Sequence, residues 1–218
     1  MMDLFIYGSG STGCELVDVA QKINKNQCRW RSIHFVDDIR VEREFYRTKI
    51  FRFNEMLAGD TEFECVIAQG EPAHRQSLYE KLTSHSIKLA TIVDTSATIS
   101  STAKIGNGCI IGPHSFISSN SILQENVMLE IHTIIGHDIT IGKHSVISSC
   151  SIIGGKTSIG DATFIGMNCT IKERLKIGKQ CIIGMHSGVF SDIDDDLIAL
   201  GNPARVVRKN EDNRVFRK

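Results

Sequence analysis

The chain has 218 residues, and its 25 lysines and arginines are balanced by 25 aspartates and glutamates, so its formal net charge is zero. The lack of a basic surplus argues against a nucleic acid as its partner, and the apolar run Leu4–Tyr7 is too short to be a signal peptide or to cross a membrane. Seven cysteines, an odd number with no CxxC pair, indicate reduced thiols and a cytoplasmic protein.

Apolar runs alternate with helical patterns over residues 1–92. Strands are predicted at Asp3–Tyr7, Ser32–Val36, Phe63–Ala68 and Lys88–Val93, and helices at Glu15–Ile23, Phe53–Ala58 and Ala73–Ser84. Strands that alternate with helices are typical of a parallel α/β sheet. We therefore expect a small α/β domain over residues 1–92.

A glycine-rich loop, Gly8-Ser9-Gly10-Ser11-Thr12-Gly13, follows the first strand and opens the first helix. Backbone N–H groups at a helix N-terminus favour anions, so this loop can cradle a phosphate. A strand-to-helix turn without a ligand explains it equally well. Asp37 and Asp38 end the second strand, at the edge where α/β domains bind ligands, although a solvated turn would also carry two acids.

From Val93 to Val189 every sixth residue is aliphatic. A continuous six-residue repeat fits neither a helix nor simple strand alternation and is the mark of a β-solenoid. Three hexads make a coil of 18 residues, so residues 18 apart stack roughly 4.8 Å from each other. We expect the aliphatics inside a triangular prism, and glycines after them wherever a corner needs a positive φ. We also expect an oligomer, because this column of aliphatics is too small to stabilise all the residues it orders.

Several histidines lie on the hexads. His114, His132 and His186 share one column, separated by multiples of 18 residues, while His137 and His144 lie on the following hexads. A histidine at a solenoid corner is usually only a surface residue. Gly136-His137-Asp138 is different, because a carboxylate beside an imidazole can fix its tautomer and raise its basicity, as a general base requires.

The chain loses the period after Val189. Ile198–Leu200 and Val206–Val207 are apolar and can cap the last coil. We expect Glu211–Lys218 to form a mobile tail.

The hexads, the segment Gly201-Asn202-Pro203-Ala204-Arg205 and the preceding α/β region resemble the left-handed β-helix acyltransferases. The whole chain is similar to bacterial sugar acetyltransferases of the sialic acid O-acetyltransferase and UDP-4-amino-sugar N-acetyltransferase family. The matching segments are Ile6-Tyr7-Gly8, Phe35-Val36-Asp37-Asp38, Ile67-Ala68-Gln69-Gly70 and Ile135-Gly136-His137-Asp138. The resemblance implies a Rossmann-like domain at 1–92, a left-handed parallel β-helix with a C-terminal cap at 93–218, and a homotrimer with clefts between its subunits.

The resemblance also implies an activity, with acetyl-CoA as cosubstrate and no metal. The acceptor is the amino group of a nucleotide-linked deoxyamino sugar, used for surface glycan synthesis. His137 would be the general base, with Asp138 raising its basicity, and the N–H of Gly155 would stabilise the oxyanion. Met167 and Met185 would touch acetyl-CoA across the subunit interface, or would simply pack in the trimer contact.

The acceptor would bind the N-terminal domain. By the resemblance, Gly10, Ser11, Thr12 and Gly70 lie near its phosphate or sugar, and Asp37 and Asp38 contact its base. Many relatives carry a histidine where this chain has Thr12 and Val146. These departures leave His137 as the main candidate base, and they leave open the sugar and its nucleotide, whether UDP, GDP or dTDP.

Three alternatives remain open. The same base could O-acetylate a sialic-type sugar. Metal-dependent γ-type carbonic anhydrases have the same prism-shaped fold. The five-residue spacing between His132 and His137 suits two zinc ligands. The third ligand position is occupied by Ser96, however, and His114 could replace it only with altered geometry. A catalytically silent solenoid that only binds or scaffolds is the last alternative.

Overall fold

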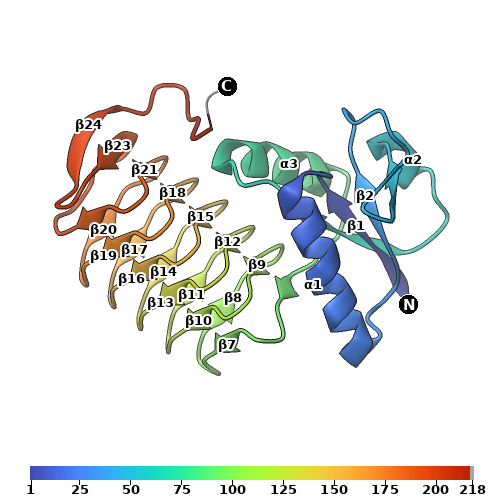
Figure 1. Cartoon of the computed structure of the whole chain (residues 1–218), viewed down its shortest axis with the longest axis horizontal. Coiled ribbons are helices and arrows are strands. Elements are labelled where there is room, and N and C mark those ends of the chain that lie inside the picture. Colours follow the sequence, from blue (N-terminus) through green and yellow to red (C-terminus); the bar gives the residue numbers. More distant parts are fainter. Residues whose placement is uncertain (217–218) are drawn as a thin grey trace.

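The computed structural model describes residues 1–216, and it joins an α/β part to a long β-helix (Figure 1). The α/β part contains β1 (Met2–Tyr7), α1 (Ser11–Gln27), β2 (Trp30–Val36), β3 (Glu44–Phe45), β4 (Thr48–Phe51), α2 (Phe53–Leu57), β5 (Phe63–Ile67) and α3 (Pro72–Ser84). Its sheet has the strand order β3-β4-β2-β1-β5, and all neighbours are parallel except β3 and β4. The predicted α/β region is confirmed.

Three details differ from the sequence-based expectations. Helix α1 begins at Ser11, inside the glycine-rich loop, and runs to Gln27. The β3–β4 hairpin was not predicted, because residues 39–47 are largely exposed and carry no alternating pattern. The single strand predicted at Lys88–Val93 is divided, since Leu89 bridges to Cys65 of β5 whereas Ile92 already pairs with Ile110 in the β-helix.

The β-helix is a prism with three walls of short strands, which are parallel except for the last strand of the chain. The covered wall contains β6 (Ile92–Val93), β9 (Ile110–Ile111), β12 (Met128–Leu129), β15 (Val146–Ile147), β18 (Phe164–Ile165), β21 (Ile182–Ile183), β23 (Leu197–Leu200) and β24 (Arg205–Lys209). The apolar wall contains β7 (Thr98–Ile99), β10 (Phe116–Ile117), β13 (Ile134–Ile135), β16 (Ile152–Ile153), β19 (Thr170–Ile171) and β22 (Gly188–Val189). The polar wall contains β8 (Lys104–Ile105), β11 (Ile122–Leu123), β14 (Thr140–Ile141), β17 (Ser158–Ile159) and β20 (Lys176–Ile177).

Residues 18 apart pair between neighbouring coils, as predicted. Phe116 pairs with Ile134, and Ile134 with Ile152. The hexad aliphatics from Ile111 onward are almost fully buried in the prism. Three edges connect the walls: the first edge joins the covered to the apolar wall, the second the apolar to the polar wall, and the third the polar to the covered wall.

The hexad glycines have a different role from the one expected. The positive φ falls on the third residue after each hexad aliphatic from Ile105 to Ile183, for example on His132 (57°) and Asp138 (56°). Gly136 lacks a side chain for another reason, because a Cβ there would lie 2.8 Å from the backbone nitrogen of Gly155. The expectation of glycine at positive φ is therefore wrong, and close stacking of the next coil explains the residue.

The N-terminal domain packs on the covered wall. The outward side chains of Met128 and Val146 are buried in one cluster with Leu16 and Val17 of α1. Burying an aliphatic side chain stabilises a fold by about 1.5–3 kcal/mol, so this shared cluster fixes the domain against the β-helix. Helix α1 lies near the first edge, and α3 lies near the third (Figure 1).

A buried arginine ties α3 to the third edge. Arg75 is fully buried, and its guanidinium donates to the carbonyls of Ile67 and Gln69 and to the side chain of Asn126. Asn126 also contacts Nδ1 of His144, and burial, then the nearby Arg75, lowers the pKa of that histidine. The loop after β5 is thereby held to the β-helix.

The C-terminal segment returns to the N-terminal domain. Strand β23 pairs with β21, so the cap over the last coil is confirmed for Ile198–Leu200, whereas the side chains of Val206 and Val207 are exposed. The predicted mobile tail is wrong for residues 211–216, because the N–H groups of Val215 and Phe216 donate to Glu71 at 3.0 and 3.1 Å. Residues 217–218 of that prediction lie outside the described chain. Within residues 1–216, no helix is both long and apolar enough to cross a bilayer.

Candidate active site

His137 and Asp138 lie on the second edge, in the corner between β13 and β14. Nδ1 of His137 and Oδ2 of Asp138 are 2.7 Å apart, and the amide of Asn120 donates to Oδ1 of Asp138 at 3.1 Å. These bonds, first that from His137 and then that from Asn120, lower the pKa of Asp138. A carboxylate acceptor requires a proton on Nδ1, so in the neutral ring the lone pair of His137 lies on Nε2.

Gly155 lies on the next coil, directly beside this imidazole. A Cβ at position 155 would be 2.7 Å from Nε2 of His137. Within residues 1–216 the backbone N–H of Gly155 donates no hydrogen bond. A basic nitrogen and an unused backbone donor therefore lie side by side, as general-base catalysis of acyl transfer requires. The His137 side chain is 54% exposed, so a substrate can reach it.

Met167 and Met185 lie on the first edge and are 48% and 62% exposed. In one chain the width of the apolar wall separates them from His137 on the second edge. His114 and His132 stack on the first edge with ring centroids 5.0 Å apart. Within the part of the chain that the structure describes, no three His, Cys, Asp or Glu side chains are grouped to hold a metal.

The glycine-rich loop leaves a helix N-terminus open. Gly8 has a φ of +114°, and a Cβ at Gly13 would collide with the carbonyl of Gly8, so these two positions require glycine. Gly10 has open space around it. In the described chain the N–H groups of Ser11 and Thr12 donate no hydrogen bond, which is the arrangement that accepts an anion.

Asp37 holds this loop in place. One carboxylate oxygen accepts from the backbone and hydroxyl of Ser9, and the other accepts from the N–H groups of Ile39 and Arg40. Burial alone would raise the pKa of Asp37, but these hydrogen bonds, led by that of Ser9, lower it to about 2. The guanidinium of Arg40 donates to the hydroxyl of Ser9 at 2.8 Å, so it adds a positive charge beside the loop.

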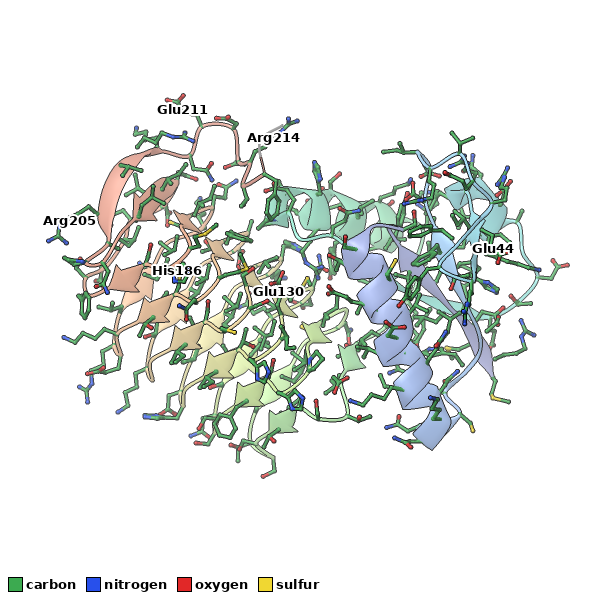
Figure 2. The ribbon with its side chains drawn as sticks, in the orientation of Figure 1. Glu44, Glu130, His186, Arg205, Glu211 and Arg214 are labelled. Carbon is green, nitrogen blue, oxygen red and sulfur yellow. The ribbon has the colours of Figure 1, made fainter. Side chains whose placement is uncertain are left out.

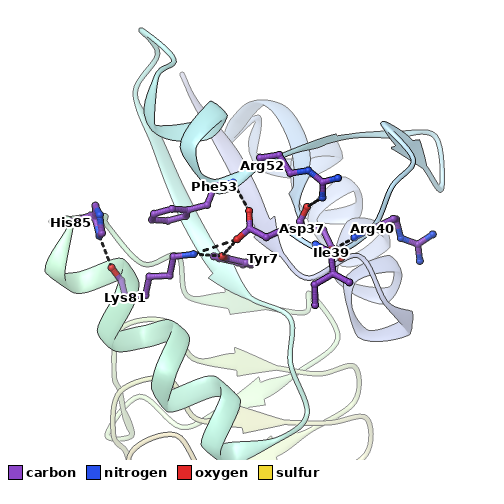
Figure 3. A network of polar contacts seen from close by, with 9 residues as sticks. Tyr7, Asp37, Ile39, Arg40, Arg52, Phe53, Lys81 and His85 are labelled. Carbon is purple, nitrogen blue, oxygen red and sulfur yellow. Dashed lines mark hydrogen bonds and ion pairs between the residues drawn. The ribbon is translucent and has the colours of Figure 1, made fainter.

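Asp38 belongs to a second network at the same edge of the sheet, and Figure 3 shows its partners Tyr7, Phe53 and Lys81. Its carboxylate accepts from the Tyr7 hydroxyl at 2.6 Å, from the Phe53 N–H at 2.8 Å and from Lys81 at 3.3 Å. The Lys81 ammonium also lies 3.8 Å from the centroid of the Phe53 ring. Tyr7, Arg40 and Lys81 were not predicted as site residues. Only Tyr7 carried a signal, as a polar residue ending a buried strand.

Two hollows are lined in part by residues of the glycine-rich loop. A pocket of ≈ 430 Å³ is lined by Gly8, Asp37, Asp38, Gln69 and His74, among others. A cavity of ≈ 520 Å³ between α1 and the first edge is lined by Thr12. Gly70 lines neither hollow and lies near the Phe216 ring. Val146, where relatives carry a histidine, is fully buried under the N-terminal domain.

Comparison with known proteins extends over both parts of the chain. A family model described as the GMPPB C-terminal domain matches residues 93–193. A GDP-perosamine N-acetyltransferase of Escherichia coli O157:H7 is 27% identical over 142 residues, which are 63% of this chain and 63% of that protein. The chain thus matches less than two thirds of the length of this curated relative.

Solved structures match almost the whole chain. The acetyltransferase domain of PglB from Neisseria gonorrhoeae FA1090, in complex with acetyl coenzyme A, has a TM-score of 0.88 at 22% identity, covering 94% of this chain and 99% of that one. PerB from Caulobacter crescentus, in complex with CoA and GDP-perosamine, has a TM-score of 0.85 at 20% identity, covering 94% and 97%. The chain therefore has the fold predicted from its hexads and N-terminal motifs, that of the left-handed β-helix sugar acetyltransferases.

Proposed function

We propose that this protein is an acetyl-CoA-dependent N-acetyltransferase that acts on the amino group of a nucleotide-linked amino sugar. The observation that carries the proposal is the free Nε2 of His137 beside the unused N–H of Gly155, with Asp138 holding the tautomer. The similar folds of an acetyl-CoA complex and a GDP-perosamine complex support the two substrates.

Each group has a role in the reaction. Nε2 of His137 takes a proton as the amine attacks the thioester carbonyl, a contribution of about 10²–10⁴ in rate. The N–H of Gly155 donates to the oxyanion of the tetrahedral intermediate. When the C–S bond breaks, the imidazolium returns the proton to the thiolate of CoA, so the products are an amide and a thiol.

The nucleotide would bind at the carboxyl edge of the α/β sheet. The open N–H groups of Ser11 and Thr12, together with Arg40, favour a diphosphate. The ≈ 430 Å³ pocket beside them is large enough for part of a nucleotide and offers Asp38 and Gln69 as polar partners for the base. Asp37 would act on the phosphate only through the loop, because its two oxygens already accept four hydrogen bonds.

We propose that the enzyme works as a homotrimer. Phe116, Ile134 and Ile152 form an exposed apolar stripe on the apolar wall, with exposed fractions of 43%, 41% and 41%. Such stripes mark protein interfaces. A partner's apolar wall packed here would bring its second edge, with His137, towards the first edge of this chain, with Met167 and Met185. Both methionines could then contact an acetyl-CoA lying in the seam.

The cellular setting follows from the substrates and the thiols. All seven cysteines are free, which is typical of a reducing compartment. We therefore propose a cytoplasmic enzyme that supplies an acetylated nucleotide sugar for surface polysaccharide synthesis.

A substrate panel tests the activity. UDP-, GDP- and dTDP-linked amino sugars are incubated with acetyl-CoA, and thiol release is measured. We expect turnover with at least one of them, and a loss of about 10²–10⁴-fold in His137→Ala with unchanged folding. No thiol release with any amino sugar would refute the proposal, and release with a free sialic acid instead would favour the O-acetyltransferase alternative.

A further inference from the structure

The ≈ 520 Å³ cavity between α1 and the first edge is the largest hollow beside the glycine-rich loop. Thr12 and Leu16 line it from α1, and Glu130 and Ile131 line it from the corner between β12 and β13. Figure 2 shows Glu130 on the part of the β-helix next to α1. The apolar side chains suit the C–H face of a sugar ring, and the carboxylates add polar partners.

The charged side chains that line this cavity are mostly negative. Its charged lining residues are Glu15, Asp18, Lys22, Asp94 and Glu130. Lys22 is already paired with Asp94 at 2.8 Å. In the described chain none of the other three carboxylates has an ion-pair partner. Burial, then the negative charge of Glu130, raises the pKa of Glu15, which reflects how closely these acids approach each other.

Glu130 is the carboxylate held most firmly. Its Oε2 accepts from the hydroxyls of Ser148 and Ser149 at 2.8 and 2.9 Å and from the N–H of Ser149 at 3.0 Å. Its Oε1 accepts no hydrogen bond from residues 1–216. The side chain is thus fixed through one oxygen, while the other is available to a donor in the cavity.

We propose that this cavity holds the amino-sugar ring of the acceptor and that Glu130 binds its ammonium group, so that the enzyme selects an amine over a hydroxyl. The inference rests on the proposed function and decides between its N- and O-acetyl forms. A hydroxyl acceptor would leave three carboxylates without a cation, whereas an ammonium neutralises one of them and donates to Oε1. Thr12 adds no charge to the lining of this cavity, whereas a histidine at that position would compete with the ammonium for the same carboxylates.

The bound ammonium must lose two protons in the reaction. One leaves to solvent, giving the neutral amine whose lone pair attacks the thioester carbon. The second passes to Nε2 of the partner's His137 when the C–N bond forms, and it then goes to the sulfur as the C–S bond breaks. Because the nitrogen is cationic both as the bound ammonium and again as it attacks, until His137 takes its proton, Glu130 binds the ground state and the transition state about equally, so its removal should raise KM with little change in kcat.

The test compares Glu130→Gln with Glu125→Gln in the full-length protein. Glutamine can still accept from Ser148 and Ser149, but it places an NH₂ group towards the cavity. Glu125 is a control on the third edge, paired with Lys143 at 3.4 Å and remote from the cavity. The ligands are the amino sugar with fastest turnover in the panel and the otherwise identical nucleotide sugar that carries a hydroxyl in place of the amine.

Binding without acetyl-CoA is measured by calorimetry, and KM and kcat by thiol release. In the wild type and in Glu125→Gln, the amino sugar should bind about ten- to hundredfold more tightly than its hydroxyl counterpart. In Glu130→Gln this preference should vanish and KM should rise by a similar factor, while kcat stays within about threefold. The inference would be overturned if Glu130→Gln kept the wild-type preference for the amino sugar and the wild-type KM, or if Glu125→Gln lost the preference to the same extent. Either result would leave the acetyltransferase proposal standing. A panel without any turnover would refute the acetyltransferase proposal itself.

Discussion

Substituting Gly155 by alanine tests the catalytic geometry most directly. The new Cβ would lie 2.7 Å from Nε2 and 3.0 Å from both neighbouring ring carbons of His137. Because comfortable contacts between such atoms begin near roughly 3.5 Å, the imidazole must move by about 0.5–0.8 Å. A displacement of about 1 Å at a reacting group can lower a rate about 10²-fold, so we expect kcat to fall by about that factor.

The folded state should hardly change in this variant. The ring is 54% exposed and can turn towards solvent, and an off-rotamer side chain is unfavourable by only about 0.5–1.5 kcal/mol. That corresponds to a fall in Tm of about 1–6 °C for a chain of this size. Gly59→Ala is the matched control, because a Cβ at Gly59 would meet only the Met56 carbonyl at 3.5 Å.

A double variant tests whether Gly155→Ala lowers kcat only by displacing the imidazole of His137. If Gly155→Ala acts by moving the imidazole, adding it to His137→Ala should change kcat by less than about threefold, because the group it displaces is already absent. The assay is thiol release at saturating acetyl-CoA, with Tm measured alongside. Wild-type kcat in Gly155→Ala, or losses that multiply in the double variant, would show that Nε2 of His137 is not the reacting base.

Three further predictions concern Asp138, Ile134 and Asp37. Asp138→Asn should lower kcat by roughly 10²–10⁴, since an amide NH₂ facing Nδ1 stabilises the wrong tautomer, while asparagine tolerates the φ of 56°; an unchanged kcat at equal Tm would contradict this. If the proposed trimer forms through the apolar wall, Ile134→Glu should be monomeric by light scattering and should lose turnover, whereas Ile134→Val should keep both assembly and turnover. A trimeric Ile134→Glu would rule out the apolar wall as the interface. The pKa of Asp37 is about 2 in the folded chain against an ordinary 3.8, so its stabilising effect is present above pH 4 and is lost as the pH falls through about 2. Asp37→Asn should therefore have a lower Tm at pH 7 and a smaller fall in Tm between pH 4 and 2, and parallel Tm curves would refute this role.

The β-helix could be predicted from the hexads because the six-residue period determines both the direction of the side chains and the register of the strands. The aliphatic at every sixth position determines which side chain points inward, and three such positions determine the register of 18 residues that pairs Phe116 with Ile134. The same arithmetic predicts that Gly155 lies beside His137. Handedness could not be derived in this way and came from the resemblance. The β3–β4 hairpin was missed because β3 has only two residues, both exposed, and β4 has only four, too few for a clear alternating pattern.

The N-terminal site is less predictable, because its residues meet only through tertiary packing. Tyr7 ends β1, Asp38 follows β2 and Lys81 lies in the last turn of α3, and no local pattern marks them as neighbours. Asp37 was assigned to the nucleotide base, yet its hydrogen bonds to Ser9 give it a structural role that the sequence does not reveal. Glu130 follows the hexad aliphatic Leu129, and nothing in the sequence sets it apart. Its proposed role depends on α1 lining the opposite side of the cavity.

The arrangement of these groups explains why a single chain carries only parts of the proposed site. The N-terminal domain and the ≈ 520 Å³ cavity lie at the covered wall and the first edge, whereas His137 and Gly155 lie on the second edge. A chain of hexads cannot move one edge towards the other, because each wall is fixed by hydrogen bonds between coils. A neighbouring copy packed on the exposed Phe116, Ile134 and Ile152 stripe can bring the two edges together. Burial of that stripe would then stabilise the assembly and complete the site in one step, which makes catalysis dependent on the oligomer.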